Sequence, residues 1–193
     1  TISETVATTN TVMTLGDANT GITLAGNTTL NTGSGALNIN GVLAGSGNND
    51  SLALNSTGVT TINKAITGIT TLTTNAGGTT VINRGVTSSG NQTYNDNVTF
   101  NGARTLTSSS GTVNFGGTVS GADGNGDELT IAGNLDLDGV ATTNIVSLTV
   151  TGNSNLGANV TTADDQTYGG TTTLSANVTL DSTGNAATDD ISL

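Results

Sequence analysis

Short runs of alternating apolar and polar residues recur along the whole chain. The Val-Thr-x-Ile pattern at residues 59–62 and the many Thr-x-Thr triplets place β-branched side chains on both faces of extended segments. Gly and Asn interrupt these runs, as at Gly77-Gly78 and Asn101-Gly102, where a tight turn needs a positive φ. No segment shows the spacing of an amphipathic helix. The pattern predicts an all-β fold of many short strands.

The apolar positions repeat with a short period of about 20 residues, which is typical of stacked-coil architectures. The segment Ile62–Ile66 recurs as Ile82–Val86, at an offset of 20. A unit of this size is too small to fold alone, but it suits one coil of a β-solenoid, which buries its apolar face by stacking on its neighbours. Looser copies share the same apolar-x-x-x-apolar form and are found at Ile39–Leu43, Phe115–Val119, Ile131–Leu135 and Leu156–Val160.

A second, longer period spans several of these units. Ile22–Leu30 aligns with Val98–Leu106 at an offset of 76, and again with Thr172–Leu180 at a further 74. The triplet Gln92-Thr93-Tyr94 recurs as Gln166-Thr167-Tyr168, also at an offset of 74. We predict one continuous array over residues 1–193, with four coils in each long repeat. The long repeats are expected at about 22–97, 98–171 and 172–193. The alternative is a string of β-sandwich modules of about 75 residues each; the short step favours the solenoid.

Composition excludes several classes of function. The 193 residues include 14 acids and 3 bases, for a net charge of −11, so nucleic acid would be repelled. No apolar run approaches the length of a membrane span. The chain has no His and no Cys, which removes the usual bases and nucleophiles of catalytic triads. These features predict a protein that is not an enzyme.

Two segments carry a resemblance to a known group of proteins. Residues 90–100, with Gly90-Asn91-Gln92-Thr93-Tyr94, and residues 111–119 resemble the Thr/Asn/Gly-rich repeats of large bacterial surface proteins of the filamentous-haemagglutinin and autotransporter-adhesin type. The resemblance is clearest from about residue 55 to 180. It implies a right-handed β-helix, secretion to the bacterial cell surface, and a role as a stalk, adhesin or matrix fibre. It transfers no binding residue to this chain.

One acidic segment is a candidate metal site. In Asp123-Gly124-Asn125-Gly126-Asp127-Glu128, oxygen ligands alternate with Gly as at the start of a calcium loop. Asp123, Asn125 and Asp127 are the predicted ligands. The sixth position is Glu128 where calcium loops have Gly, and the twelfth is Asn134 where they have Glu, which favours a solvated acidic turn. The segment Asn48-Asn49-Asp50 corresponds to it in the first long repeat, which predicts a loop that leaves the coil at a fixed place. No other cofactor is predicted.

Carboxylate pairs are the remaining candidates for chemistry. Asp136 and Asp138 lie two positions apart on one predicted strand, and two further pairs are Asp164-Asp165 and Asp189-Asp190. Glycosidases need only two carboxylates, although sugar-cleaving clefts are usually lined by aromatic rings, which are scarce here. Exposed acids at turns are the favoured interpretation.

The three cations of the chain are evenly spaced. Lys64, Arg84 and Arg104 lie at equal intervals of 20 in the sequence, so coils of that length would stack them in a column. Asp96 is a candidate to lie between them. The column is either a solvated edge or a contact strip for an acidic partner or a neighbouring chain.

Three functions remain open from the sequence. The first is an extracellular structural or adhesive rod that contacts neighbouring repeats, other copies of itself, or a host or matrix glycan or protein. The second is a subunit of a self-assembling extracellular filament, since neither end of the sequence resembles the polar cap of a solenoid. The third is a carbohydrate-binding or carbohydrate-cleaving solenoid.

Overall fold

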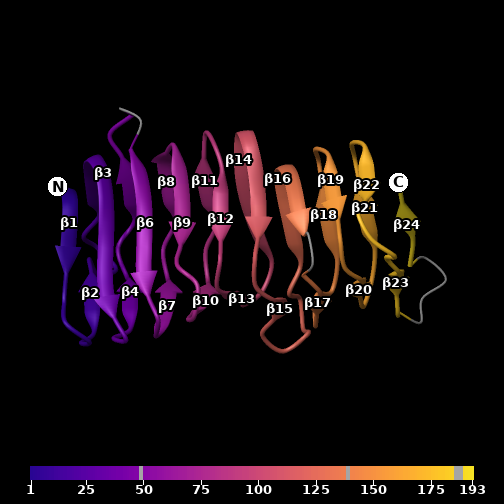
Figure 1. The fold of residues 1–193 in the computed structure, drawn as a ribbon, viewed down its shortest axis with the longest axis horizontal. Helices are drawn as coiled ribbons and strands as arrows, with labels where there is room; N and C mark the ends of the chain where they lie inside the picture. The colour runs from indigo at the N-terminus through magenta and orange to yellow at the C-terminus, as the bar shows by residue number, and fades with distance from the viewer. Residues whose placement is uncertain (48–49, 138–139, 185–188) are drawn as a thin grey trace.

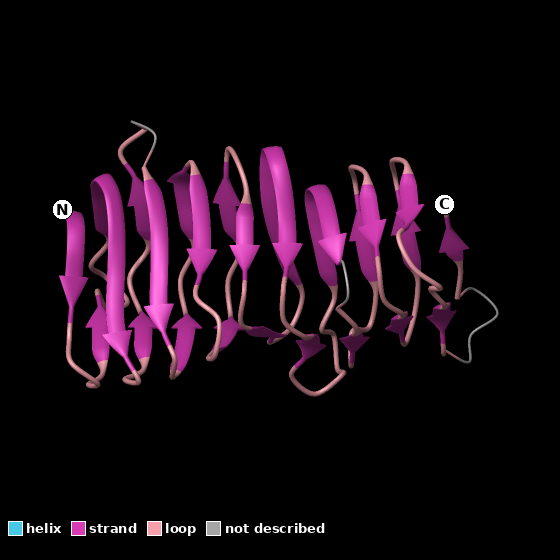
Figure 2. Ribbon diagram, in the orientation of Figure 1, coloured by secondary structure: helices cyan, strands magenta, loops and turns pink. Residues whose placement is uncertain are grey.

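The protein is a single elongated stack of β-coils. A computed structural model describes residues 1–47, 50–137, 140–184 and 189–193. The chain winds through about nine coils from one end of the long axis to the other, and each coil contributes strand segments to three faces (Figure 1). None of the described residues is helical (Figure 2). The all-β prediction is confirmed.

The strands line three faces, which we call faces 1, 2 and 3. Three long strands run through a corner without a break and serve both face 1 and face 2: β3 (Ile22–Gly33), β14 (Arg104–Phe115) and β16 (Leu129–Leu137). Face 1 is completed by β5 (Leu43–Gly45), β8 (Ile66–Ile69), β11 (Val86–Ser88), β18 (Leu148–Val150), β21 (Gln166–Tyr168) and β24 (Ile191–Ser192). Face 2 is completed by β1 (Ile2–Ala7), β6 (Ser51–Ser56), β9 (Thr71–Thr74), β12 (Gln92–Tyr94), β19 (Ser154–Leu156) and β22 (Thr172–Leu174). Face 3 holds β2 (Met13–Leu15), β4 (Leu37–Ile39), β7 (Val59–Ile62), β10 (Thr79–Ile82), β13 (Asn97–Phe100), β15 (Val119–Gly121), β17 (Thr142–Thr143), β20 (Val160–Thr162) and β23 (Leu180–Ser182).

The described strands pair in parallel with equivalent strands of neighbouring coils, and face 3 has one interruption, between β17 and β20. Ile62 is paired with Ile82 on face 3, and Ile66 with Val86 on face 1, as the short step predicts. The step is not constant: Ser154 pairs with Thr172, an offset of 18, whereas Leu106 pairs with Ile131, an offset of 25. The β-sandwich alternative is wrong, because sandwich modules are built from antiparallel strands and the ladders here are parallel.

Inward side chains form one core that runs along the axis. Alternation along each strand sends every second side chain inside, as in β6, where Leu52 and Leu54 are buried between half-buried neighbours. One part of the core holds three rings, with Tyr94 stacked on Phe115 at 5.3 Å between centroids and Phe100 edge-on to Phe115 at 6.3 Å. Burying one large apolar side chain contributes about 1.5–3 kcal/mol. Since a coil gains this only against its neighbours, the stack folds as an array.

The looser copies of the short repeat do not all lie at the same corner of the coil. Ile39–Leu43 joins face 3 to face 1, as Ile62–Ile66 does. By contrast, Phe115–Val119 and Leu156–Val160 turn from face 2 to face 3, and Ile131–Leu135 turns from face 1 to face 2. At each of these corners an inward apolar residue precedes and follows the turn, so the same spacing arises at all three kinds of corner.

The long repeat is not a whole number of coils. Ile22 lies on face 1, Val98 on face 3 and Thr172 on face 2. When β3, β14 and β16 are counted once for each face, eleven strand positions separate β3 from β13, and eleven separate β13 from β22. Eleven positions make three coils and two thirds. The prediction of four coils per long repeat is therefore wrong.

A buried hydrogen-bond network explains the repeated Gln-Thr-Tyr triplet. Gln92 Nε2 donates to Thr107 O at 2.7 Å, Ser88 Oγ at 3.1 Å and Val86 O at 3.3 Å, while Tyr94 Oη donates to Gln92 Oε1 at 2.9 Å. The amide thereby satisfies carbonyl groups inside the corner, where an unpaired polar group would be costly. The second triplet repeats this network at a different corner.

Candidate functional site

Face 2 carries two columns of outward polar side chains. In its C-terminal half the first column consists of Thr112, Asn134, Asn153 and Thr171, and the second of Asn114, Asp136, Asn155 and Thr173. They come from β14, β16, β19 and β22, whose alternating strands send Val113, Leu135 and Leu156 inward. Between the columns lies a shallow depression of about 300 Å³, which we call the polar groove.

Asp136 lies at the centre of the polar groove. Its Oδ2 accepts a hydrogen bond from Asn114 Nδ2 at 2.9 Å, and its Oδ1 accepts one from Asn155 Nδ2 at 3.2 Å. The three side chains come from consecutive coils, so the carboxylate links neighbouring rungs. Because each amide turns its N–H groups toward Asp136, the carbonyl oxygens of Asn114 and Asn155 are left as acceptors.

The other column of the groove is tied to the backbone. Asn134 Oδ1 accepts the N–H of Asn153, and Asn153 Oδ1 accepts the N–H of Thr171, both at 2.9 Å. Each amide therefore links one coil to the next by a hydrogen bond from side chain to backbone. Ser154 also lines the groove, and its buried hydroxyl has no hydrogen-bond partner among the described residues.

The predicted carboxylate pairs are distributed over different parts of the fold. Asp136 lies in the polar groove, whereas Asp138 lies outside the described residues. Asp164, Asp165 and Asp189 come together at the corner from face 3 to face 1, with ligand oxygens within 4.8 Å of one another. A side-chain hydrogen bond with Asp189 and the charges of both neighbouring carboxylates raise the pKa of Asp164. Such a group could hold a cation, but exposed acidic clusters are common without one.

The predicted calcium loop is closed by its own backbone. Asp127 is 1 % exposed; its Oδ1 accepts the N–H of Gly102 at 2.5 Å, and its Oδ2 accepts those of Asp123 and Gly124 at 3.0 Å. Burial alone would raise the pKa of Asp127, but these N–H groups together lower it. Both oxygens are thus committed, and Asp123 Oδ1 accepts the N–H of Asn125 at 2.9 Å. The three residues fit a self-closed loop better than an ion cage; calcium binding stays a prediction.

A second buried acid, Asp50, ends the corresponding segment of the first long repeat, of which Asn48 and Asn49 lie outside the described residues. Asp50 Oδ2 accepts hydrogen bonds from the backbone N–H and the hydroxyl of Ser46. Each loop follows a Gly, Gly45 or Gly121, at which a Cβ atom would overlap a carbonyl oxygen of the next coil. These two Gly are separated by an offset of 76 and lie at different corners, like the other long-repeat pairs. The sequence predicted that these loops leave the coil at one fixed corner. That prediction is wrong, because equivalent positions of the long repeat lie at different corners.

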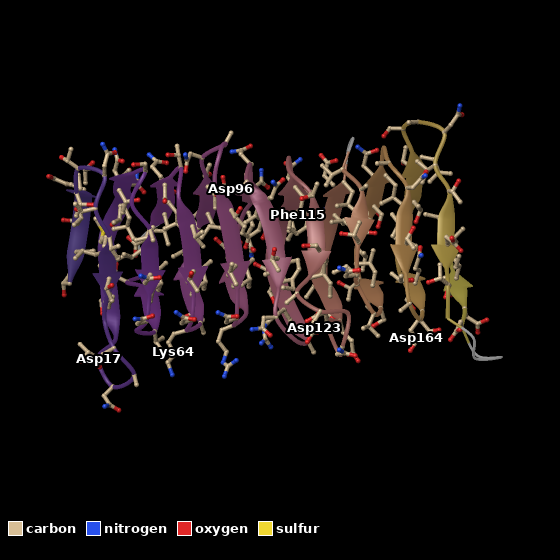
Figure 3. All side chains as sticks on the ribbon, turned by 90° about the horizontal axis from the view of Figure 1, so that it is seen from below. Asp17, Lys64, Asp96, Phe115, Asp123 and Asp164 are labelled. Atoms are coloured by element: carbon tan, nitrogen blue, oxygen red, sulfur yellow. The ribbon has the colours of Figure 1, made fainter. Side chains whose placement is uncertain are left out.

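The three cations do form a column. Ile66, Val86 and Leu106 are paired in successive coils, which places Lys64, Arg84 and Arg104 two positions earlier at one corner. Figure 3 shows Lys64, Asp123 and Asp164 along this edge of the rod. Burial and the charge of Arg84 lower the pKa of Arg104, while Asp127 opposes them.

Asp96 does not lie between the cations, contrary to the prediction. It is 1 % exposed at another corner, where it accepts hydrogen bonds from Gly78 N and Thr80 Oγ1, both at 3.0 Å (Figure 3). Burial raises the pKa of Asp96, against the effect of these two donors. It is a structural residue of the turn.

Sequence reasoning found Asp136 but missed the asparagines around it. The signal was present as polar–apolar–polar alternation in Asn134-Leu135-Asp136 and in the equivalent triplet Asn153-Ser154-Asn155. Only the register of β16 on β19 shows that these triplets stack.

Comparisons of the chain with protein-family models, curated proteins and solved structures gave no significant match. The resemblance to bacterial surface repeats therefore stays a prediction. No helix among the described residues is long and apolar enough to cross a membrane.

Proposed function

We propose that this chain is a structural and adhesive rod segment of a secreted bacterial surface protein, and that it acts without catalysis. The observation that carries the proposal is the single core, which runs through successive coils beneath a surface of short Thr, Asn, Ser and Gly side chains. Such a stack separates its two ends by a fixed distance, about 4.8 Å for each coil. A spacer needs that property and a catalyst does not.

Coil excision tests the modular rod. Deleting residues 67–86 removes one complete coil and joins Ile66 to Thr87, which keeps every inward column in register. We expect a soluble β protein with a modestly lower melting temperature. The matched control deletes residues 67–76, about half a coil, which shifts the register and should unfold the protein. If both deletions unfold it equally, the modular rod is wrong.

Surface location has its own test. Antibodies raised against the purified chain should label intact cells of the organism that encodes it. Labelling that appears only after the cells are permeabilised would contradict a surface role.

A further inference from the structure

We propose that the polar groove on face 2 binds an extended neutral polysaccharide, with the sugar chain lying along the solenoid axis. This inference rests on the proposed adhesive function for its biological setting, and it names the partner. Asp136, Asn153 and Asn155 line the groove, and Asn114 lies beside it, hydrogen-bonded to Asp136.

The hydrogen-bonding groups of the groove match those of sugar hydroxyls. The carbonyl oxygens of Asn114 and Asn155 accept hydrogen bonds, and Asn153 Nδ2 donates them, because its own Oδ1 is held by the Thr171 N–H. Thr171 and Thr173 add hydroxyl groups that both donate and accept. A sugar hydroxyl also does both, so a hydroxyl-rich ligand can satisfy every one of these groups.

The charge of the groove selects a neutral ligand. Asp136 is the only ionised side chain among the residues that line it, and the whole chain has a net charge of −11. An anionic polysaccharide would be repelled. A calcium ion takes six to eight oxygen ligands, whereas the Asp136 oxygens already accept two amide N–H groups.

The shape of the groove selects an extended ligand. Its lining residues come from four consecutive coils, so equivalent groups repeat about every 4.8 Å along the axis. A small compact ligand would touch one or two rungs, while a linear chain engages all four. No aromatic ring lines the groove, so binding depends on many hydrogen bonds in a row, and we expect weak affinity for each unit.

The N-terminal half of the same face provides a matched comparison. The same two columns continue there, but β9 carries Thr71 and Thr73 at the positions of Asn153 and Asn155. Threonine lacks the longer amide that spans from one rung to the next. The first column of the N-terminal half does hold Asn27 and Asn91. A carbohydrate site that depends on the second-column amides of Asn114 and Asn155 should therefore be confined to the C-terminal half.

Native affinity electrophoresis tests the proposal. The probes are three soluble neutral polysaccharides, barley β-glucan, glucomannan and dextran, with alginate as the anionic comparison. We expect at least one neutral polymer to retard the protein and alginate to have no effect. Asn155→Ala should weaken retardation about tenfold, the equivalent of about 1.4 kcal/mol, while Thr73→Ala should leave it unchanged.

Several outcomes would overturn the proposal. They are retardation by alginate alone, equal effects of Asn155→Ala and Thr73→Ala, and no retardation by any neutral polymer. Melting temperatures of the variants show whether a loss of binding is a loss of fold; Asn155→Gln, which keeps the amide, should restore part of the binding lost in Asn155→Ala. Since excision of residues 67–86 and antibody labelling do not involve the groove, the rod proposal can survive the failure of this one.

Discussion

The corners around Gln92 and Gln166 have the same internal hydrogen bonds at different places in the coil. Gln166 Nε2 donates to Asp181 O, Thr162 Oγ1 and Val160 O, which correspond in the long repeat to the three acceptors of Gln92. The first corner joins face 1 to face 2, and the second joins face 3 to face 1. The same hydrogen-bonded corner can therefore form at different positions in the coil, with different strands packed around it.

The largest expected difference between the two corners lies in the rings. Tyr94 is completely buried and stacks on Phe115, whereas Tyr168 is 3 % exposed and has no ring partner among the described residues. Tyr94→Ala should cost about 3–5 kcal/mol in the free energy of unfolding. Tyr168→Ala should cost about 1 kcal/mol less, because it breaks no aromatic pair. Urea denaturation measures both; equal losses would show that the stacked pair adds nothing.

The two buried amides should behave alike. Gln92→Leu and Gln166→Leu each leave carbonyl groups unpaired inside a corner, so each should cost about 2–3 kcal/mol. Thr93→Ala, which changes the outward residue between Gln92 and Tyr94, is the control and should stay within about 0.5 kcal/mol. A difference above about 1 kcal/mol between the two Gln variants would mean that the corners are not equivalent.

Substitution of Asp127 and of Asp50 should lower stability by different amounts, although both carboxylates accept backbone N–H groups of the preceding residues. Asp127→Asn turns an amide N–H toward backbone N–H donors and should cost about 1–2 kcal/mol at neutral pH. Asp50→Asn should cost less, since Asp50 Oδ1 has no hydrogen-bond partner among the described residues. Thermal unfolding of both variants checks the order, which the reverse result would contradict.

The Asp127 effect should also depend on pH. Its pKa is lowered in the folded state, so its contribution to stability is present above the unfolded pKa and is lost as pH falls through the folded pKa. The gap between the wild-type protein and Asp127→Asn should therefore narrow in acid. A gap that is constant from neutral pH into strong acid would exclude this linkage.

The smallest expected effect is that of Thr162→Ser. Thr162 Oγ1 donates to Asp164 O and accepts from Gln166 Nε2, and Ser88 Oγ makes the same two bonds to Gly90 O and Gln92 Nε2. The substitution keeps both bonds and removes one methyl group, so it should cost about 1 kcal/mol or less. A larger loss of stability would indicate that a serine hydroxyl cannot replace the threonine hydroxyl at the Gln166 corner.

The solenoid could be predicted from the sequence because periodicity is a property of the chain itself. The match of Ile62–Ile66 with Ile82–Val86 gave the correct register, since two neighbouring coils happen to have equal length. The face on which a residue lies could not be predicted, because the coils differ in length and the same apolar spacing occurs at all three kinds of corner. Asp96 was misplaced for this reason. Prediction of the polar groove would have required the same information, namely which strands are neighbours in the sheet.

The mismatch between eleven strand positions and three faces has a consequence for how the rod meets its environment. Any feature that occurs once in each long repeat advances around the axis by a net two thirds of a turn, which is one third of a turn in the opposite direction, so it follows a spiral stripe. The starts at Ile22, Val98 and Thr172 already lie on three different faces. Three repeats are thus enough to present the same surface in every direction, whichever way the rod rotates about its own axis.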